Sequence, residues 1–128
     1  MTASDLTPTV TSPDFGRDPL GYYIWHLNTH GELYQAFRGL ADTYRLRNPQ
    51  RPVSADMICH VLRFNSTLGA DDDTFRVNNV ITPLYARLYL IERPQARISV
   101  RNSWLDTLNE IERELLYSAF YPLREVTP

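Results

Sequence analysis

Residues 18–49, DPLGYYIWHLNTHGELYQAFRGLADTYRLRNP, determine the fold class of this chain. Asp18 followed by Pro19 predicts a helix start, because aspartate accepts hydrogen bonds from free backbone amides and proline loses nothing at the first helical position. Apolar residues then recur at helical spacing until Pro49. We expect two helices here, separated near Gly31. Their apolar faces carry Leu20, Tyr23, Ile24 and Leu27, and then Leu33, Ala36, Phe37, Leu40, Ala41 and Tyr44.

Three further helices are predicted after this stretch. Ser54 caps the first, Asn78 or Asn79 caps the second, and Pro94 ends the second. The third covers roughly 104–120. Its expected buried side chains are Leu105, Leu108, Ile111 and Leu115.

Residues 97–101, RISVR, alternate polar and apolar side chains, which predicts a strand with Ile98 and Val100 pointing inward. Residues 75–77 form a shorter alternating stretch. The sequence therefore predicts a mainly α protein of about five helices with one or two short strands. A winged-helix-like α+β arrangement is the alternative, because helix, loop, helix and strand follow one another over residues 53–101.

The chain of 128 residues has the length of one domain. We expect a flexible N-terminal segment over 1–16, a single helical domain over 17–121 and a C-terminal tail over 122–128. Cys59 is the only cysteine, which excludes an intramolecular disulfide. The polar N-terminus has no signal-peptide pattern, and no apolar run approaches the ~18 residues of a membrane span. A cytoplasmic protein without a membrane partner is expected.

The sequence shows no recognisable catalytic, cofactor-binding or metal site. His26 and His30 have chelating spacing but no third ligand close in sequence, and Cys59 and His60 are adjacent, so their side chains diverge on a helix. No nucleophile elbow or phosphate-binding glycine loop occurs. We therefore expect a protein that is not an enzyme and needs no cofactor.

Charge is distributed unevenly along the chain. Every one of the 13 basic residues is arginine. Residues 38–101 hold ten arginines against six carboxylates, a net charge of +4, whereas residues 1–37 and 102–128 each carry −3. Arginine suits phosphate, carboxylate and aromatic faces. The candidate binding surface comprises Arg63, Arg76, Asn78, Asn79, Tyr85, Arg87, Arg93, Arg97 and Arg101.

The stretch TFRVNNVITPLYARLYLIERP, residues 74–94, preceded by VSADMICHVLRFNST, resembles a group of short phage and bacterial proteins. The resemblance covers residues 32–94, and after Pro94 this chain departs from the group's aromatic and acidic continuation. It implies an accessory context in a mobile element and supplies no catalytic role. The shared positions are Asn78, Asn79, Tyr85, Ala86, Arg87, Leu88 and Pro94, with Ser54, Leu62 and Arg63 upstream.

Two functions fit these features. The first is a protein-interaction module, homodimeric through the acidic helix 104–120, with opposite charges on the centre and ends of the chain permitting head-to-tail pairing. The alternative is a DNA-binding, winged-helix-like regulatory protein that uses residues 54–101. Arginines gathered on one face would favour nucleic acid, and arginines paired with carboxylates would favour a protein partner.

Overall fold

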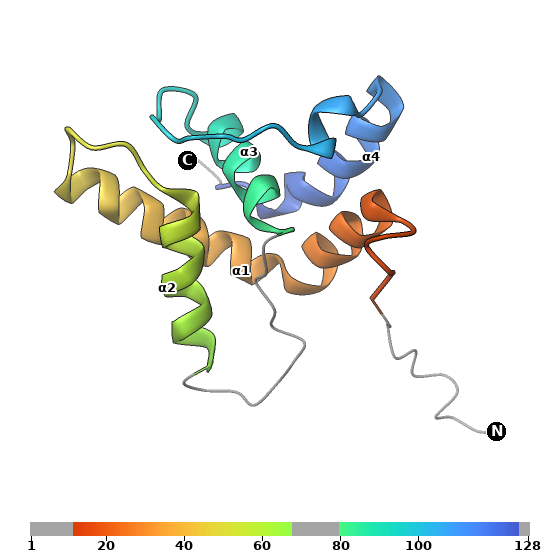
Figure 1. The fold of residues 1–128 in the computed structure, drawn as a ribbon, viewed down its shortest axis with the longest axis horizontal. Coiled ribbons are helices and arrows are strands. Elements are labelled where there is room, and N and C mark those ends of the chain that lie inside the picture. The colour runs from red at the N-terminus through yellow and green to blue at the C-terminus, as the bar shows by residue number, and fades with distance from the viewer. Residues whose placement is uncertain (1–11, 68–79, 126–128) are drawn as a thin grey trace.

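The computed structural model describes residues 12–67 and 80–125, and these are mainly helical, as predicted. The elements are α1 (Pro19–Arg47), α2 (Ala55–Thr67), α3 (Thr82–Glu92) and α4 (Glu110–Phe120), with short 3₁₀ helices η2 (Trp104–Thr107) and η3 (Tyr121–Leu123). Helix α1 runs along most of the molecule, with α2 crossing near one end and α3 and α4 packed on one side (Figure 1). No helix in the described ranges is both long enough and apolar enough to cross a membrane.

The two helices expected before Pro49 form one continuous helix with a kink. Asp18 caps α1 by accepting a hydrogen bond from the Gly21 amide, as predicted. His30 has non-helical backbone angles (φ −126°, ψ 35°), so the direction changes one residue from the expected break at Gly31. A Cβ at Gly31 would overlap the Leu123 side chain. Glycine therefore permits the C-terminal segment to pack against the kink.

The core includes a cluster of aromatic side chains from α1, α3 and α4. Tyr34, Phe37, Tyr85 and Phe120 have no exposed surface. The ring centroids of Phe37 and Tyr85 lie 5.2 Å apart, and those of Tyr34 and Phe120 lie 5.6 Å apart in an edge-to-face arrangement. Such pairs add to the burial of apolar area. These contacts hold α3 and α4 against α1.

The strand predicted at 97–101 forms only one isolated parallel bridge, between Val53 and Ile98. The Val53 amide donates to the Arg97 carbonyl at 2.7 Å, but Val100, expected inside, is 38% exposed. No sheet forms within the described residues, and the stretch 75–77 lies outside them. The alternation was misleading because a strand is stable only beside partner strands. The described residues therefore lack the sheet that the winged-helix-like alternative predicts.

The helix predicted over 104–120 is interrupted. Leu108 is extended (φ −63°, ψ 136°) and separates η2 from α4, and each of these helices begins with its own capping box. The interruption changes which side of α4 faces the core. The buried side chains of α4 are Leu116, Ala119 and Phe120. The expectation that Ile111 and Leu115 are buried is wrong, because they are 72% and 52% exposed.

The helical domain extends beyond its predicted boundaries at 17 and 121. Before α1, the Phe15 ring packs edge-on against Tyr23 at 5.5 Å. After α4, the predicted C-terminal tail includes part of η3, and the Leu123 carbonyl accepts a hydrogen bond from Arg38 at 2.9 Å. Both ends of the described chain therefore contribute to the fold.

Candidate functional site

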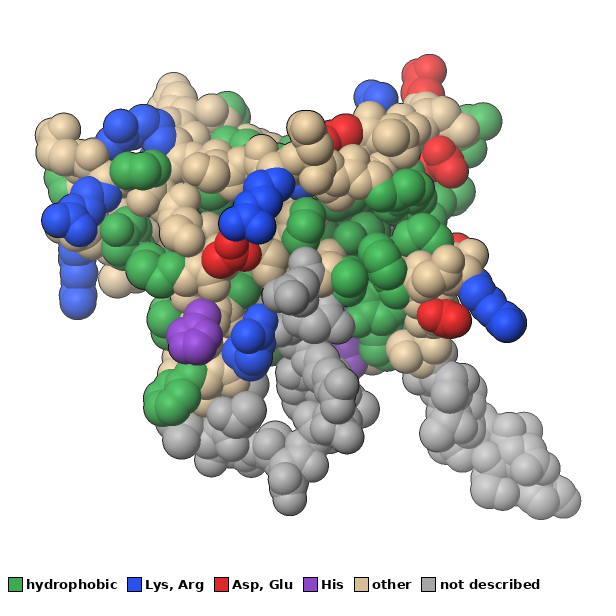
Figure 2. Space-filling view, in the orientation of Figure 1, with side chains coloured by type: hydrophobic (Ala, Val, Ile, Leu, Met, Phe, Trp, Pro, Cys, Tyr) green, Lys and Arg blue, Asp and Glu red, His purple; other side chains and the backbone are tan. Residues whose placement is uncertain are grey.

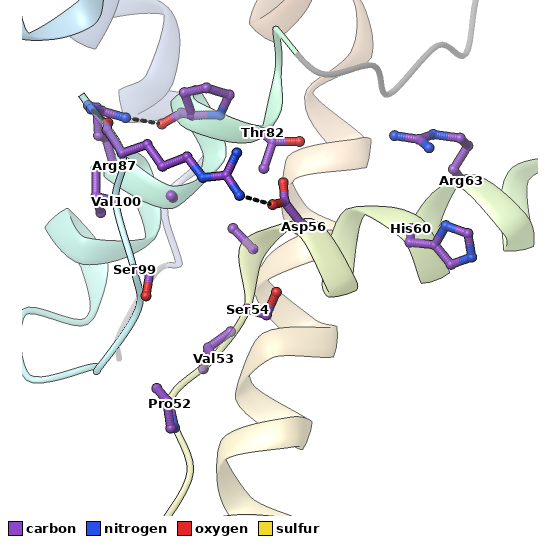
Figure 3. A pocket seen from close by; sticks show the side chains of 14 residues that line it. Pro52, Val53, Ser54, Asp56, His60, Arg63, Thr82, Arg87, Ser99 and Val100 are labelled. Atoms are coloured by element: carbon purple, nitrogen blue, oxygen red, sulfur yellow. Dashed lines mark hydrogen bonds and ion pairs between the residues drawn. The ribbon is translucent and has the colours of Figure 1, made fainter. Parts of the chain in front are cut away.

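A hollow of about 640 Å³ lies where the N-terminal ends of α2 and α3 approach the 99–101 segment. Arg63, Arg87 and Arg101, three of the predicted binding residues, line it from these three separate elements. In Figure 3, Arg63 and Arg87 lie on opposite sides of the hollow, with Asp56 between them. We call this cavity the arginine hollow.

All three nitrogens of the Arg87 guanidinium donate hydrogen bonds to other residues of the chain. Its Nε and Nη2 donate to the two carboxylate oxygens of Asp106 at 3.1 and 3.0 Å. Its Nη1 donates to the Pro83 carbonyl at 2.9 Å, and Nη2 also donates to the Arg101 carbonyl at 2.6 Å. The hydrogen bond from Arg87 is the main reason that the pKa of Asp106 is lowered. Arg87 therefore joins α3 to η2 and holds the 99–101 segment.

The side chain of Arg101 is more exposed to solvent than that of Arg87 in the arginine hollow. It contacts Asp56 at 3.4 Å, and the two side chains are 87% and 63% exposed. An ion pair this exposed contributes little to stability and rearranges readily. Chemically, the hollow can bind an anion. Cys59 does not line the hollow, and its burial raises the pKa of its thiol to about 11.

Of the remaining predicted binding residues, the three that the structure describes do not line this hollow. Arg93 pairs with Asp42 at 2.7 Å and with Glu125 at 2.8 Å. Arg97 is exposed and lines a separate hollow of about 190 Å³. The prediction of Tyr85 as a surface residue is wrong, because Tyr85 is fully buried and its hydroxyl lies 2.7 Å from Nε2 of His26. The other three, Arg76, Asn78 and Asn79, lie outside the described residues.

Helix α4 has an exposed face whose residues are not in the predicted candidate binding surface, although the acidic helix 104–120 is expected to form a homodimer. This face consists of Glu110, Ile111, Glu114 and Leu115, which we call the α4 face. The two aliphatic side chains lie one turn apart beside two exposed carboxylates, and neither carboxylate forms an ion pair within the described residues. The apolar repeat of the sequence included Ile111 and Leu115 but assigned them to the core. Only the break at Leu108 turns them outward.

A second group of exposed apolar side chains lies on α2. Met57, Val61 and Phe64 are 38%, 37% and 60% exposed, whereas Ile58, Cys59 and Leu62 face the core.

His26 and His30, the spaced pair noted in the sequence, are both buried. Over the described ranges, no three His, Cys, Asp or Glu side chains converge as a metal site would require.

Comparison with protein-family models, with curated proteins and with solved structures gives no match. The function is therefore inferred from the surfaces of this chain alone.

Proposed function

We propose that this chain is a non-enzymatic, cytoplasmic accessory protein that acts as a protein-interaction module and binds its partner through the α4 face. The observation that carries this proposal is the exposure of two aliphatic side chains one turn apart, Ile111 at 72% and Leu115 at 52%. An exposed apolar pair beside charged residues is typical of a small interface with an apolar centre and a polar rim.

The pairing of the arginines also favours a protein partner. Arg38, Arg87 and Arg93 each form a close ion pair with a carboxylate of the same chain. A cation that is already neutralised inside the fold releases few counterions when it meets a phosphate backbone. Three of the ten arginines in the basic centre, residues 38–101, are thus used to hold the fold together.

We expect a photo-activated cross-linking residue at position 111 to capture one protein of defined mass, because this side chain protrudes from the α4 face. The same residue at Asn28, an exposed position on α1, is the matched control. The measurement is mass spectrometry of adducts, from the purified chain at high concentration and from cells that express it. Equal adducts from positions 111 and 28 would overturn the proposal. So would the absence of adducts when the cross-linking residue stands at 111 and, in a second variant, at 115.

A second candidate function is binding of nucleic acid at the arginine hollow, favoured by the gathering of three arginines there. We expect Arg63→Ala with Arg101→Ala to lower the salt dependence of DNA binding by a slope of about 1.8, because each lost phosphate contact removes about 0.9. Arg87 is left intact because it holds the fold. The measurement is fluorescence anisotropy across salt concentrations. Absence of binding at about 50 mM salt excludes this function.

A further inference from the structure

The end of the molecule opposite the α4 face carries an exposed apolar side chain and positive charge, which complement the apolar and acidic α4 face. Leu46, close to the C-terminus of α1, is 83% exposed, the most exposed large apolar side chain described. Three exposed arginines belong to the same end of the molecule: Arg47 follows Leu46 in the chain, and Arg51 and Arg97 line a hollow with Asn48, the C-cap of α1. None of the three forms an ion pair within residues 12–67 and 80–125. We call these four residues the Leu46 end.

The two surfaces lie far apart on one molecule. In Figure 2, arginine side chains gather at the left end, where α1 finishes, and carboxylates gather at the upper right, where α4 begins. A copy of this chain therefore cannot join its own two surfaces through these rigid helices. A second copy can bring them together.

The surfaces match in both charge and apolar content. The α4 face presents an aliphatic pair beside Glu110 and Glu114, and the Leu46 end carries one exposed aliphatic side chain and three exposed arginines. Guanidinium groups bind carboxylates in a bidentate manner, and opposite potentials align two surfaces during encounter. Contact between unlike ends would thus neutralise charges that have no partner in the described chain.

A symmetric dimer through the α4 face is disfavoured by the same charges. Two copies meeting α4 to α4 would place Glu110 and Glu114 of one copy near the same carboxylates of the other. Juxtaposed like charges at an interface are costly. The homodimer through helix 104–120 that the sequence suggested is therefore less favourable than contact between unlike ends.

We propose that the α4 face of one copy docks on the Leu46 end of a second copy, in a head-to-tail manner. This inference rests on the proposed function, because it names the partner of the same α4 face. Each joined pair still has one free surface of each kind, so association continues into open chains or closes into a ring. The small apolar contact predicts a weak complex, with a dissociation constant on the order of 0.1 mM.

The test is a charge swap followed by multi-angle light scattering across concentration. We expect the unmodified chain to grow past the mass of a dimer, and to do so less at high salt. Two double variants, R47E/R51E and E110R/E114R, each reverse the charge of one surface, so that both surfaces then carry charge of the same sign. Each variant should therefore raise the dissociation constant by about tenfold or more. Circular dichroism and thermal melting confirm that each variant is folded.

Restoration separates the charge effect from damage to the fold. An equal mixture of the two variants, and a single chain carrying all four substitutions, should both regain association because unlike ends are available again. A strictly monomeric unmodified chain at about 1 mM, growth that stops at a dimer, or failure of the mixture to associate would each overturn the inference. If position 111 instead cross-links to a different protein in cells while the pure chain stays monomeric, the proposed function stands and the head-to-tail inference fails.

Discussion

Glu92→Ala is expected to lower the free energy of unfolding by about 3–5 kcal/mol, because it leaves a buried guanidinium without its counter-charge. The Glu92 side chain is 5% exposed and pairs with Arg38, which is 14% exposed, at 3.0 Å. Glu92 also accepts hydrogen bonds from the Tyr34 hydroxyl at 2.6 Å and from the Glu125 amide at 2.9 Å. One carboxylate thereby joins α1, α3 and the C-terminal segment. Urea unfolding measures the loss.

Two further variants make this prediction specific. Asp56→Ala removes an exposed carboxylate whose pair with Arg101 is 3.4 Å long, and its expected cost is below about 1 kcal/mol. Glu92→Leu combined with Arg38→Met removes both buried charges and should recover part of the stability lost by Glu92→Ala. If Glu92→Ala costs no more than Asp56→Ala, the central position that we give this carboxylate is wrong.

Acid is expected to destabilise the protein well before its carboxylates titrate, because of His26. Burial, with a smaller contribution from His30, lowers the pKa of His26 from 6.5 to about 4. Since the unfolded chain takes up a proton at higher pH than the folded chain, the stability present above pH 6.5 is lost as pH falls toward 4. The slope is about 1.4 kcal/mol per pH unit and the total loss is about 3 kcal/mol.

The measurement is the free energy of unfolding between pH 7 and pH 4. The pKa of Glu92 lies below its usual value, because hydrogen bonds from Glu125, Tyr34 and Arg38 outweigh the opposing effect of burial, so its own contribution is lost only below about pH 4.3. His26→Gln should remove most of the slope between pH 6.5 and 4. His60→Gln, at an exposed position on α2, is the matched control and should leave the slope in place. An unchanged slope in His26→Gln would contradict this assignment.

The contacts of Arg93 and Arg87 give a structural reason for arginine rather than lysine at these two positions. Arg93 donates through Nε and Nη2 to the two oxygens of Asp42 at 3.1 and 2.7 Å and reaches Glu125 at 2.8 Å. Arg87 bridges Asp106 and two backbone carbonyls. A lysine ammonium at either position has neither the planar fork nor the number of directed donors that these contacts use. Structural need therefore favours arginine over lysine at these two positions.

Local signals in the sequence predicted several of the helix ends, but the start of α3 is not among them, because Ile81 stands at its N-cap and makes no side-chain capping hydrogen bond. Asp18 and Ser54 cap α1 and α2 as expected, because a capping hydrogen bond spans only two or three residues. The glycine at position 31 marks the kink within one residue. The helix end before Pro94 is also confirmed. Each of these features depends on neighbours along the chain, which is the information that a single sequence contains.

Features that depend on distant partners could not be predicted in this way. Alternation at 97–101 suggests a strand, but whether a neighbouring strand is present is a property of the whole fold. Aromatic residues at helical spacing are compatible with a core or a surface, and only the packing of α3 against α1 buries Tyr85. The partner of Arg93 in the fold, Asp42, lies 51 residues away in the chain.

The sequence by itself determined the helical class, the caps of α1 and α2, the helix end before Pro94 and the absence of a recognisable catalytic motif, because periodicity and capping act over a few residues. The tertiary structure decided which charges are neutralised inside the fold and which remain available. It also decided which apolar residues are buried, since the extended backbone at Leu108 turns Ile111 and Leu115 away from the core. The proposed binding surface exists only because of that turn.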